Sequence, residues 1–231
     1  MANIETVFPG VFRVDGTLAT KNLVKGTRTY GEKLLAADDG SEYRIWDLFR
    51  SKLAAAIRKG LAEMPIAPGK SVLYLGAATG TTVSHVSDIV GLDGAEGGAI
   101  AVEFAQRSFR DLLHNCEKRG NIMPVMGDAR KPEIYAAEIK EVCGGKVDAV
   151  YQDVAQPDQG RILLKNADMF LRKGGHAMLC IKSQSIDVTK RPGEVYKATL
   201  SELEAGGFET LQTIELAPYD KDHLFWMGRK N

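Results

Sequence analysis

The fold of this chain is decided by one stretch, Val72-Leu-Tyr-Leu-Gly-Ala-Ala-Thr-Gly-Thr-Thr-Val-Ser-His-Val86. Its four leading apolar residues predict a buried strand, and the small residues from Gly76 to Gly80 predict a tight turn that lets the backbone approach a ligand. The threonines that follow are natural helix caps. A strand, such a turn and a helix in this order hold a nucleotide-like cofactor at the carboxyl end of a parallel sheet.

The composition sets limits on the class of protein. The 231 residues can form one α/β domain with a smaller appendage. Lys and Arg (30) balance Asp and Glu (30), whereas a protein that grips nucleic acid alone usually has a strong basic excess. The three cysteines lack metal-ligand spacing, which predicts reduced thiols and no metal site. Since we find no membrane-length apolar run and no signal peptide, we expect a cytoplasmic protein without a membrane role.

Residues 1–55 are predicted to form a small β-rich domain. We expect strands at 7–14, 23–30 and 42–46, with a hairpin turn at Asp15-Gly16. A helix is predicted at 51–60, where Gly60 ends it, and prolines then break the chain. The main domain is expected to occupy residues 56–231.

Strands and helices alternate through the main domain. The strands are predicted at 72–75, 99–104, 123–126, 147–152, 176–181, 209–216 and 224–228. The helices are predicted at 82–90, 106–119, 133–142, 159–171 and 194–206. This pattern indicates a mostly parallel sheet with helices on both faces. Because only residues 217–222 separate the last two strands, they should form an antiparallel hairpin. A seven-stranded α/β sheet that ends in this way is the Rossmann-like fold of class I methyltransferases.

The turn at Gly76 also narrows the cofactor. It lacks the third glycine of the dinucleotide fingerprint, which a cofactor without phosphates, such as S-adenosylmethionine, does not need. Glu103, at the end of the second strand, is placed to accept hydrogen bonds from both ribose hydroxyls, and Phe104 could pack against adenine. Asp128 could accept from the adenine amine while the N–H of Ala129 donates to the ring. The alternative interpretations are that the glycine turn is only structural, that Glu103 is a surface carboxylate and that Asp128 caps the next helix.

Two opposite charges follow adjacent strands. Asp153 ends the fourth strand and Lys182 ends the fifth, so both face the ligand crevice and can meet in one site. The alternative is a salt bridge at the rim of the sheet. His223 lies in the hairpin that joins the last strands, where a lone histidine is as often structural as functional.

With these residues identified, the chain resembles the fibrillarin family, in its archaeal form without a glycine- and arginine-rich extension. The resemblance spans essentially the whole chain and rests on residues 42–56, 74–86, 101–104, 127–130, 153–157 and 181–183. It is specific, because generic methyltransferases lack the Thr-Thr-Val-Ser-His run (81–85) and the Asp-Val-Ala-Gln-Pro run (153–157). One departure is Trp46-Asp47-Leu48, where Asn-Pro is expected after the aromatic residue.

The resemblance implies both a cofactor site and a catalytic set. Together with the glycine turn, it assigns S-adenosylmethionine contacts to Gly76, Ala77, Gly80, Thr81, Thr82, Glu103, Phe104, Asp128, Ala129, Asp153, Val154, Ala155 and Gln156. The implied catalytic set is Lys52, Asp153, Lys182 and His223, with Asp222 as the alternative at the last position. Lys182 would stabilise negative charge on a ribose 2′-oxygen, while Asp153 orients it and takes the proton.

The implied activity is box C/D guide-RNA-directed 2′-O-methylation of rRNA, and of tRNA in some cases. The implied partners are the guide and target RNA, a Nop5-type scaffold and an L7Ae-type RNA-binding protein. Base pairing would then select the target, which explains how a neutral enzyme acts on RNA. The alternatives are a methyltransferase for protein glutamine or a small molecule, a non-catalytic assembly subunit, and a nicotinamide oxidoreductase. The missing third glycine and the terminal hairpin disfavour the last of these.

Overall fold

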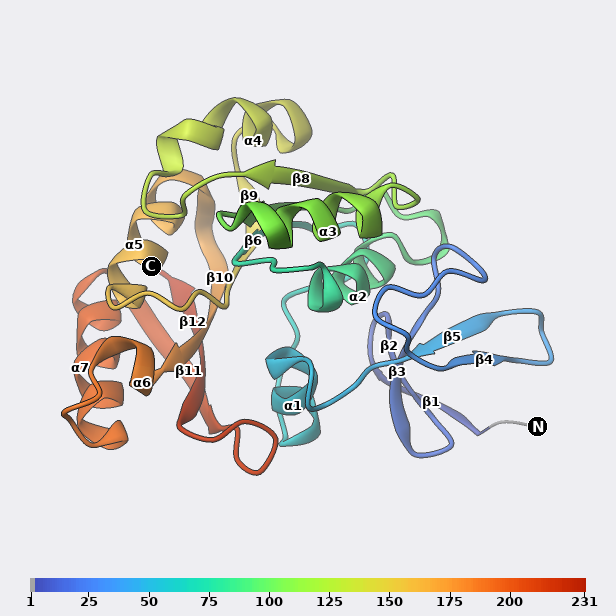
Figure 1. The fold of residues 1–231 in the computed structure, drawn as a ribbon, viewed down its shortest axis with the longest axis horizontal. Helices are drawn as coiled ribbons and strands as arrows, with labels where there is room; N and C mark the ends of the chain where they lie inside the picture. Colours follow the sequence, from blue (N-terminus) through green and yellow to red (C-terminus); the bar gives the residue numbers. More distant parts are fainter. Residues whose placement is uncertain (1–2) are drawn as a thin grey trace.

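The chain folds around two sheets, a smaller one and a larger one (Figure 1). The computed structural model describes residues 3–231. The smaller sheet has the order β1-β2-β3-β5-β4 and is antiparallel throughout. Its strands are β1 (Ile4–Phe8), β2 (Val11–Val14), β3 (Thr17–Lys21), β4 (Leu34–Ala36) and β5 (Glu42–Ile45).

The larger sheet has the order β11-β12-β10-β9-β6-β7-β8. Its strands are β6 (Ser71–Leu75), β7 (Gly98–Glu103), β8 (Ile122–Met126), β9 (Val147–Gln152), β10 (Leu171–Lys182), β11 (Phe208–Glu215) and β12 (His223–Lys230). Pairing is parallel from β8 to β10 and antiparallel on both sides of β12. The predicted seven-stranded class I methyltransferase fold and its terminal hairpin are therefore confirmed.

Helices cover both faces of the larger sheet. They are α1 (Lys52–Arg58), α2 (Thr81–Val90), α3 (Gln106–Cys116), α4 (Ala136–Cys143), α5 (Gln159–Phe170), α6 (Ser183–Ile186) and α7 (Pro192–Ala205), with 3₁₀ turns η1 (Leu92–Gly94) and η2 (Pro132–Tyr135). Successive strand residues point to opposite faces, so Val72 and Tyr74 pack with α1, α2 and α3, while Leu73 and Leu75 pack with α4, α5 and α7. No helix within residues 3–231 is both long and apolar enough to span a membrane.

The prediction of a strand at 23–30 is wrong. This segment is irregular because side chains rather than a neighbouring strand satisfy its backbone: the Glu32 carboxylate accepts the N–H groups of Thr29 and Tyr30 at 2.8–3.1 Å. The strands beside β5 are β3 and β4 instead. The hairpin turn at Asp15-Gly16 is confirmed, since it joins β2 to β3 with positive φ at both residues (48° and 80°).

Helix α1 crosses the predicted domain boundary at residue 55, and this boundary remains a prediction. The helix lies beside the β11–β12 hairpin in Figure 1. Just after the helix, the Gln212 side chain of β11 donates to the Gly60 carbonyl (3.0 Å) and accepts from the Ala62 N–H (2.9 Å). Helix α1 is thus bound to the larger sheet.

A buried network of charges joins the smaller sheet to helix α2. Arg44 of β5 bridges Glu32 (2.6 Å) and Asp88 of α2 (2.7 Å), and Arg119 reaches the other oxygen of Asp88 at 2.6 Å. All four side chains are at most 1% exposed. Because charges in such surroundings are stable only when paired, Asp88 fixes how the two sheets meet.

Replacing Asp88 by Asn should therefore destabilise the fold strongly. Within residues 3–231, the variant leaves the buried Arg119 guanidinium with no carboxylate at ion-pair distance and leaves Arg44 with Glu32 alone. We expect this to lower the free energy of unfolding by about 3 kcal/mol. Urea denaturation measures this change. Asp93→Asn is the matched control, because Asp93 is 69% exposed in its pair with Lys21 and should cost less than about 1 kcal/mol. Equal stability of the two variants would contradict a structural role for Asp88.

Candidate active site

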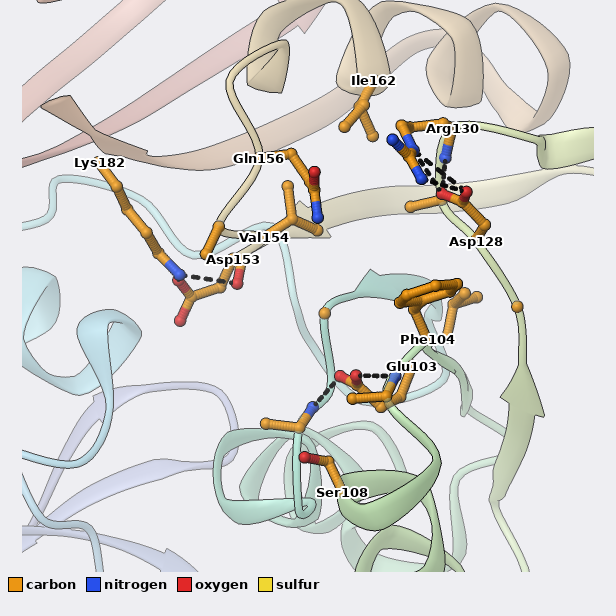
Figure 2. Close-up of a pocket in the computed structure, with 17 residues that line it drawn as sticks. Glu103, Phe104, Ser108, Asp128, Arg130, Asp153, Val154, Gln156, Ile162 and Lys182 are labelled. Atoms are coloured by element: carbon orange, nitrogen blue, oxygen red, sulfur yellow. Dashed lines mark hydrogen bonds and ion pairs between the residues drawn. The ribbon is translucent and has the colours of Figure 1, made fainter. Parts of the chain in front are cut away.

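A pocket of about 340 Å³ opens at the carboxyl ends of β6, β7, β8 and β9 (Figure 2). Figure 2 shows Asp128 and Arg130 at one side, Glu103 and Phe104 at another, and Asp153 with Lys182 at the opposite end. Of the predicted cofactor residues, those that line it are Gly76, Glu103, Phe104, Asp128, Ala129, Asp153, Val154, Ala155 and Gln156. The structure thus brings nine of the predicted contacts together in one cavity.

The Gly76 turn allows two strand ends to approach each other closely. Gly76 has a φ of +80°, and a Cβ at this position would lie 2.8 Å from the Asp153 carbonyl oxygen. Ala78 also has positive φ (49°), and its N–H donates to Glu103 at 2.8 Å. At position 76, only glycine allows both the positive φ and the short distance to the Asp153 carbonyl. Gly76 therefore sets the distance between the turn and Asp153.

Glu103 is held by the backbone around it. Its two carboxylate oxygens accept the N–H groups of Ala78 (2.8 Å) and Ala105 (2.7 Å). Each oxygen retains a lone pair for a further donor, such as a ribose hydroxyl. Phe104, the next residue, is 61% exposed and offers an aromatic face at the same side of the cavity. A fixed acceptor beside an aromatic ring fits an adenosine group.

Asp128 forms an ion pair with Arg130 that the sequence analysis did not predict. The Arg130 guanidinium donates to both carboxylate oxygens at 2.8–3.1 Å, and these hydrogen bonds hold the pKa of Asp128 below its usual value. The carboxylate thus stays ionised as an acceptor at the pocket wall. The Ala129 carbonyl accepts from the Asn166 amide at 2.8 Å, which fixes the backbone at this corner.

Asp153 binds two lysines at once. Its Oδ1 lies 2.7 Å from Lys182 Nζ, and its Oδ2 lies 3.2 Å from Lys52 Nζ. Lys182 also donates to the Asp153 main-chain carbonyl at 3.0 Å. The three side chains are only 15–19% exposed. The predicted grouping of Lys52, Asp153 and Lys182 is present in the structure at the edge of this pocket.

Lys52 lies between two carboxylates, because Asp220 Oδ2 is 3.3 Å from its Nζ. Burial by itself would lower the pKa of Lys52, but the negative charges of Asp153 and Asp220 outweigh it and raise the pKa above its usual 10.5. Lys52 therefore remains an ammonium at neutral pH and does not act as a base. Sequence reasoning missed Asp220, which lies in a loop without a recognisable motif.

His223 joins this group through Asp220. Its Nδ1 is 2.9 Å from Asp220 Oδ1 and 2.6 Å from the Lys221 carbonyl. It also pairs with Lys182 in the register of β10 and β12. The other candidate, Asp222, has an exposed side chain, while its carbonyl accepts from the Ser183 hydroxyl at 3.0 Å.

Four predicted cofactor residues do not line this pocket: Ala77, Gly80, Thr81 and Thr82. The buried Thr82 hydroxyl donates to Ser51 at 3.0 Å, and Gly80 is the left-handed residue that precedes α2.

Seven lining residues were not predicted: Ala78, Val102, Ala105, Ser108, Gly127, Arg130 and Ile162. Most flank a predicted residue, so extending each strand-end motif by one or two positions would have found them. Within residues 3–231, no three His, Cys, Asp or Glu side chains gather as a metal site.

The larger sheet, its terminal hairpin and the pocket at its strand ends define a class I methyltransferase. The family model described as Fibrillarin matches residues 2–231, so the chain belongs to the fibrillarin family. A fibrillarin-like rRNA/tRNA 2′-O-methyltransferase of Pyrococcus horikoshii is 50% identical over 228 residues, covering 96% of each chain. The predicted family is confirmed.

Two solved structures extend the comparison. Aeropyrum pernix fibrillarin, in complex with natively bound S-adenosyl-L-methionine, has a TM-score of 0.85 and 46% identity, over 99% of this chain and 100% of that one. The fibrillarin chain of a fibrillarin/Nop5p complex has a TM-score of 0.82 and 42% identity, over 96% and 98% of the two chains.

Replacing Gly76 by Ala should damage both the fold and the pocket. We expect a loss of at least about 2 kcal/mol in unfolding free energy, from the positive φ and the collision with the Asp153 carbonyl. We also expect about tenfold weaker S-adenosylmethionine binding by calorimetry, which is 1.4 kcal/mol. Gly174→Ala is the control, because Gly174 has a similar φ of +72° with no atom near a Cβ. The same losses in both variants would rule out the close approach as the cause.

Proposed function

We propose that this protein is an S-adenosylmethionine-dependent methyltransferase that transfers a methyl group to ribose 2′-hydroxyls of rRNA and, in some cases, tRNA. The observation that carries the proposal is the Lys182–Asp153 ion pair (2.7 Å) at the edge of the cofactor pocket. A ribose hydroxyl is a weak acid, so its attack needs a cation near the oxygen and an acceptor for the proton. This ion pair supplies both.

The pocket residues fit S-adenosylmethionine, which supplies an activated methyl group when bound. Glu103 would accept the ribose hydroxyls, Phe104 would pack against adenine, and Asp128 would accept from the adenine amine. These groups lie away from Asp153 and Lys182 in Figure 2. Binding at one end of the pocket thus directs the remainder of a bound molecule toward the ion pair, and this positioning supplies much of the rate acceleration.

We assign the catalytic roles from the charges. Lys182 stabilises negative charge that develops on the 2′-oxygen, because its ammonium is fixed at 2.7 Å from Asp153 and cannot turn away. Asp153 holds both lysines and takes the hydroxyl proton. Lys52, an ammonium with two carboxylate partners, helps to hold the acceptor nucleotide.

We further propose that the enzyme works in a box C/D guide-RNA complex in the cytoplasm. A Nop5-type scaffold is supported by the relative that is solved with Nop5p, and an L7Ae-type protein would bind the guide RNA. The balance of 30 basic and 30 acidic residues supports delivery of the target by partners. Base pairing with the guide would select the nucleotide, so the chain itself need not read bases.

Reconstitution tests this function directly. The chain is combined with guide RNA, a Nop5-type and an L7Ae-type protein, labelled S-adenosylmethionine and a target RNA. We expect one 2′-O-methyl group at the nucleotide that the guide specifies, and none on a target whose 2′-hydroxyl is replaced by hydrogen. Label on protein alone, or methylation that ignores the guide, would refute the proposal.

Variants of the ion pair test the catalytic roles. Lys182→Ala and Asp153→Ala should each lower the single-turnover rate constant by about 100-fold or more, because each removes one part of the proton and charge handling. The dissociation constant for S-adenosylmethionine should change less than about threefold for Lys182→Ala. Lys146→Ala, at the other end of β9, is the control that retains the full rate. A full rate in either active-site variant would refute these roles.

A further inference from the structure

The loop that joins β11 to β12 docks on the segment that carries Lys52. The Phe49 and Tyr219 rings meet edge to face with centroids 5.3 Å apart, and Lys59 Nζ donates to the Ala217 carbonyl. Lys52 and Lys59 are seven residues apart, about two helical turns, so they lie on the same side of α1. In Figure 1 this loop lies beside α1. The docking brings Asp220 to Lys52.

Asp220 uses its two carboxylate oxygens on different partners. Oδ2 lies 3.3 Å from Lys52 Nζ, and Oδ1 lies 2.9 Å from His223 Nδ1. Asp153 likewise divides its oxygens between Lys182 (2.7 Å) and Lys52 (3.2 Å). The side chains therefore form one line of alternating charge: Lys182, Asp153, Lys52 and Asp220, ending at the His223 ring.

This arrangement also decides where the proton of His223 lies. The Nδ1 atom faces the Asp220 carboxylate and, at 2.6 Å, the Lys221 carbonyl. Both groups can only accept hydrogen bonds, so Nδ1 must carry the proton. In the neutral ring, Nε2 then holds the lone pair.

Within residues 3–231, Asp153 and Asp220 are the only carboxylates paired with the Lys52 ammonium. Without Asp220, Lys52 would be drawn to Asp153 alone and would compete with Lys182 for it. The balanced distances of 3.2 and 3.3 Å show that Lys52 is shared between both carboxylates.

We propose that Asp220 is a positioning residue that holds Lys52 away from Lys182 and fixes His223 with its proton on Nδ1. This role rests on the proposed function, because its consequence is the rate of methyl transfer. Asp220 touches neither the cofactor pocket nor Lys182, so its effect passes through Lys52 and His223.

The kinetic test measures single-turnover methyl transfer in the assembled guide complex. Asp220→Ala should lower the rate constant by about tenfold or more, the scale of a misplaced catalytic group, while S-adenosylmethionine affinity and the melting temperature hardly change. Asp220→Glu, which keeps the carboxylate, should recover most of the rate. Glu215→Ala, an exposed carboxylate on the neighbouring strand, should have no effect.

A double-mutant cycle separates positioning from simple damage. In a Lys52→Ala background, Asp220→Ala should cause a smaller loss than in the parent protein, because the part of its effect that passes through Lys52 is already gone. A loss of the same factor in both backgrounds, or a rate within twofold of the parent protein in Asp220→Ala, would overturn the proposal.

Nuclear magnetic resonance supplies a readout that needs neither RNA nor cofactor. The ¹⁵N shifts of His223, assigned by comparison with His223→Gln, should show the Nδ1–H tautomer in the parent protein. In Asp220→Ala the excess of this tautomer should be smaller, because only the Lys221 carbonyl then accepts from Nδ1. Unchanged shifts would overturn the proposal even if methylation succeeds. Absence of methylation in the parent protein would refute the proposed function instead, and the tautomer result would still decide the role of Asp220.

Discussion

The structure depends on one carboxylate that is shared by two ammonium groups. Asp153 stands at the carboxyl end of β9, with Lys182 at 2.7 Å and Lys52 at 3.2 Å. Its carbonyl also lies against Gly76, so the same residue joins the glycine turn to the two lysines. Because opposite charges at this partly buried edge stabilise one another, each side chain has little freedom to turn. The geometry of the whole site therefore depends on Asp153.

The small N-terminal sheet explains how a lysine outside the parallel sheet reaches this carboxylate. The buried Arg44–Asp88 pair fixes that sheet on α2, and Trp46 stacks on His85 of α2 with ring centroids 4.7 Å apart. Ser51, which caps α1, accepts from Thr82 at 3.0 Å. These contacts guide the chain along α2 and place Lys52 at the first position of α1. The Thr-Thr-Val-Ser-His run thus supports the site by packing, because two of its members, Thr82 and His85, contact this segment.

Sequence reasoning located the residues that follow buried parallel strands. The end of an apolar run indicates where a strand ends, and parallel strands end at one edge of the sheet. This made it possible to predict Glu103, Asp128, Asp153 and Lys182. Lys52 came only from family resemblance, since nothing local distinguishes it from a solvated helix lysine. Asp220 could not be predicted, because its partners come from the docking of a loop on a helix far away in the chain. The strand expected at 23–30 failed for a related reason, since the Glu32 carboxylate binds backbone groups that a strand would have paired.

The central claim is that Asp153 and Lys182 act as one unit. The most direct test is a double-mutant cycle on the single-turnover rate constant of 2′-O-methyl transfer, with both residues replaced by Ala singly and together. If the unit is real, the double variant is no slower than the slower single variant, because removing either partner already disables the other. If the two losses multiply instead, the residues act independently, and this account of the site is contradicted.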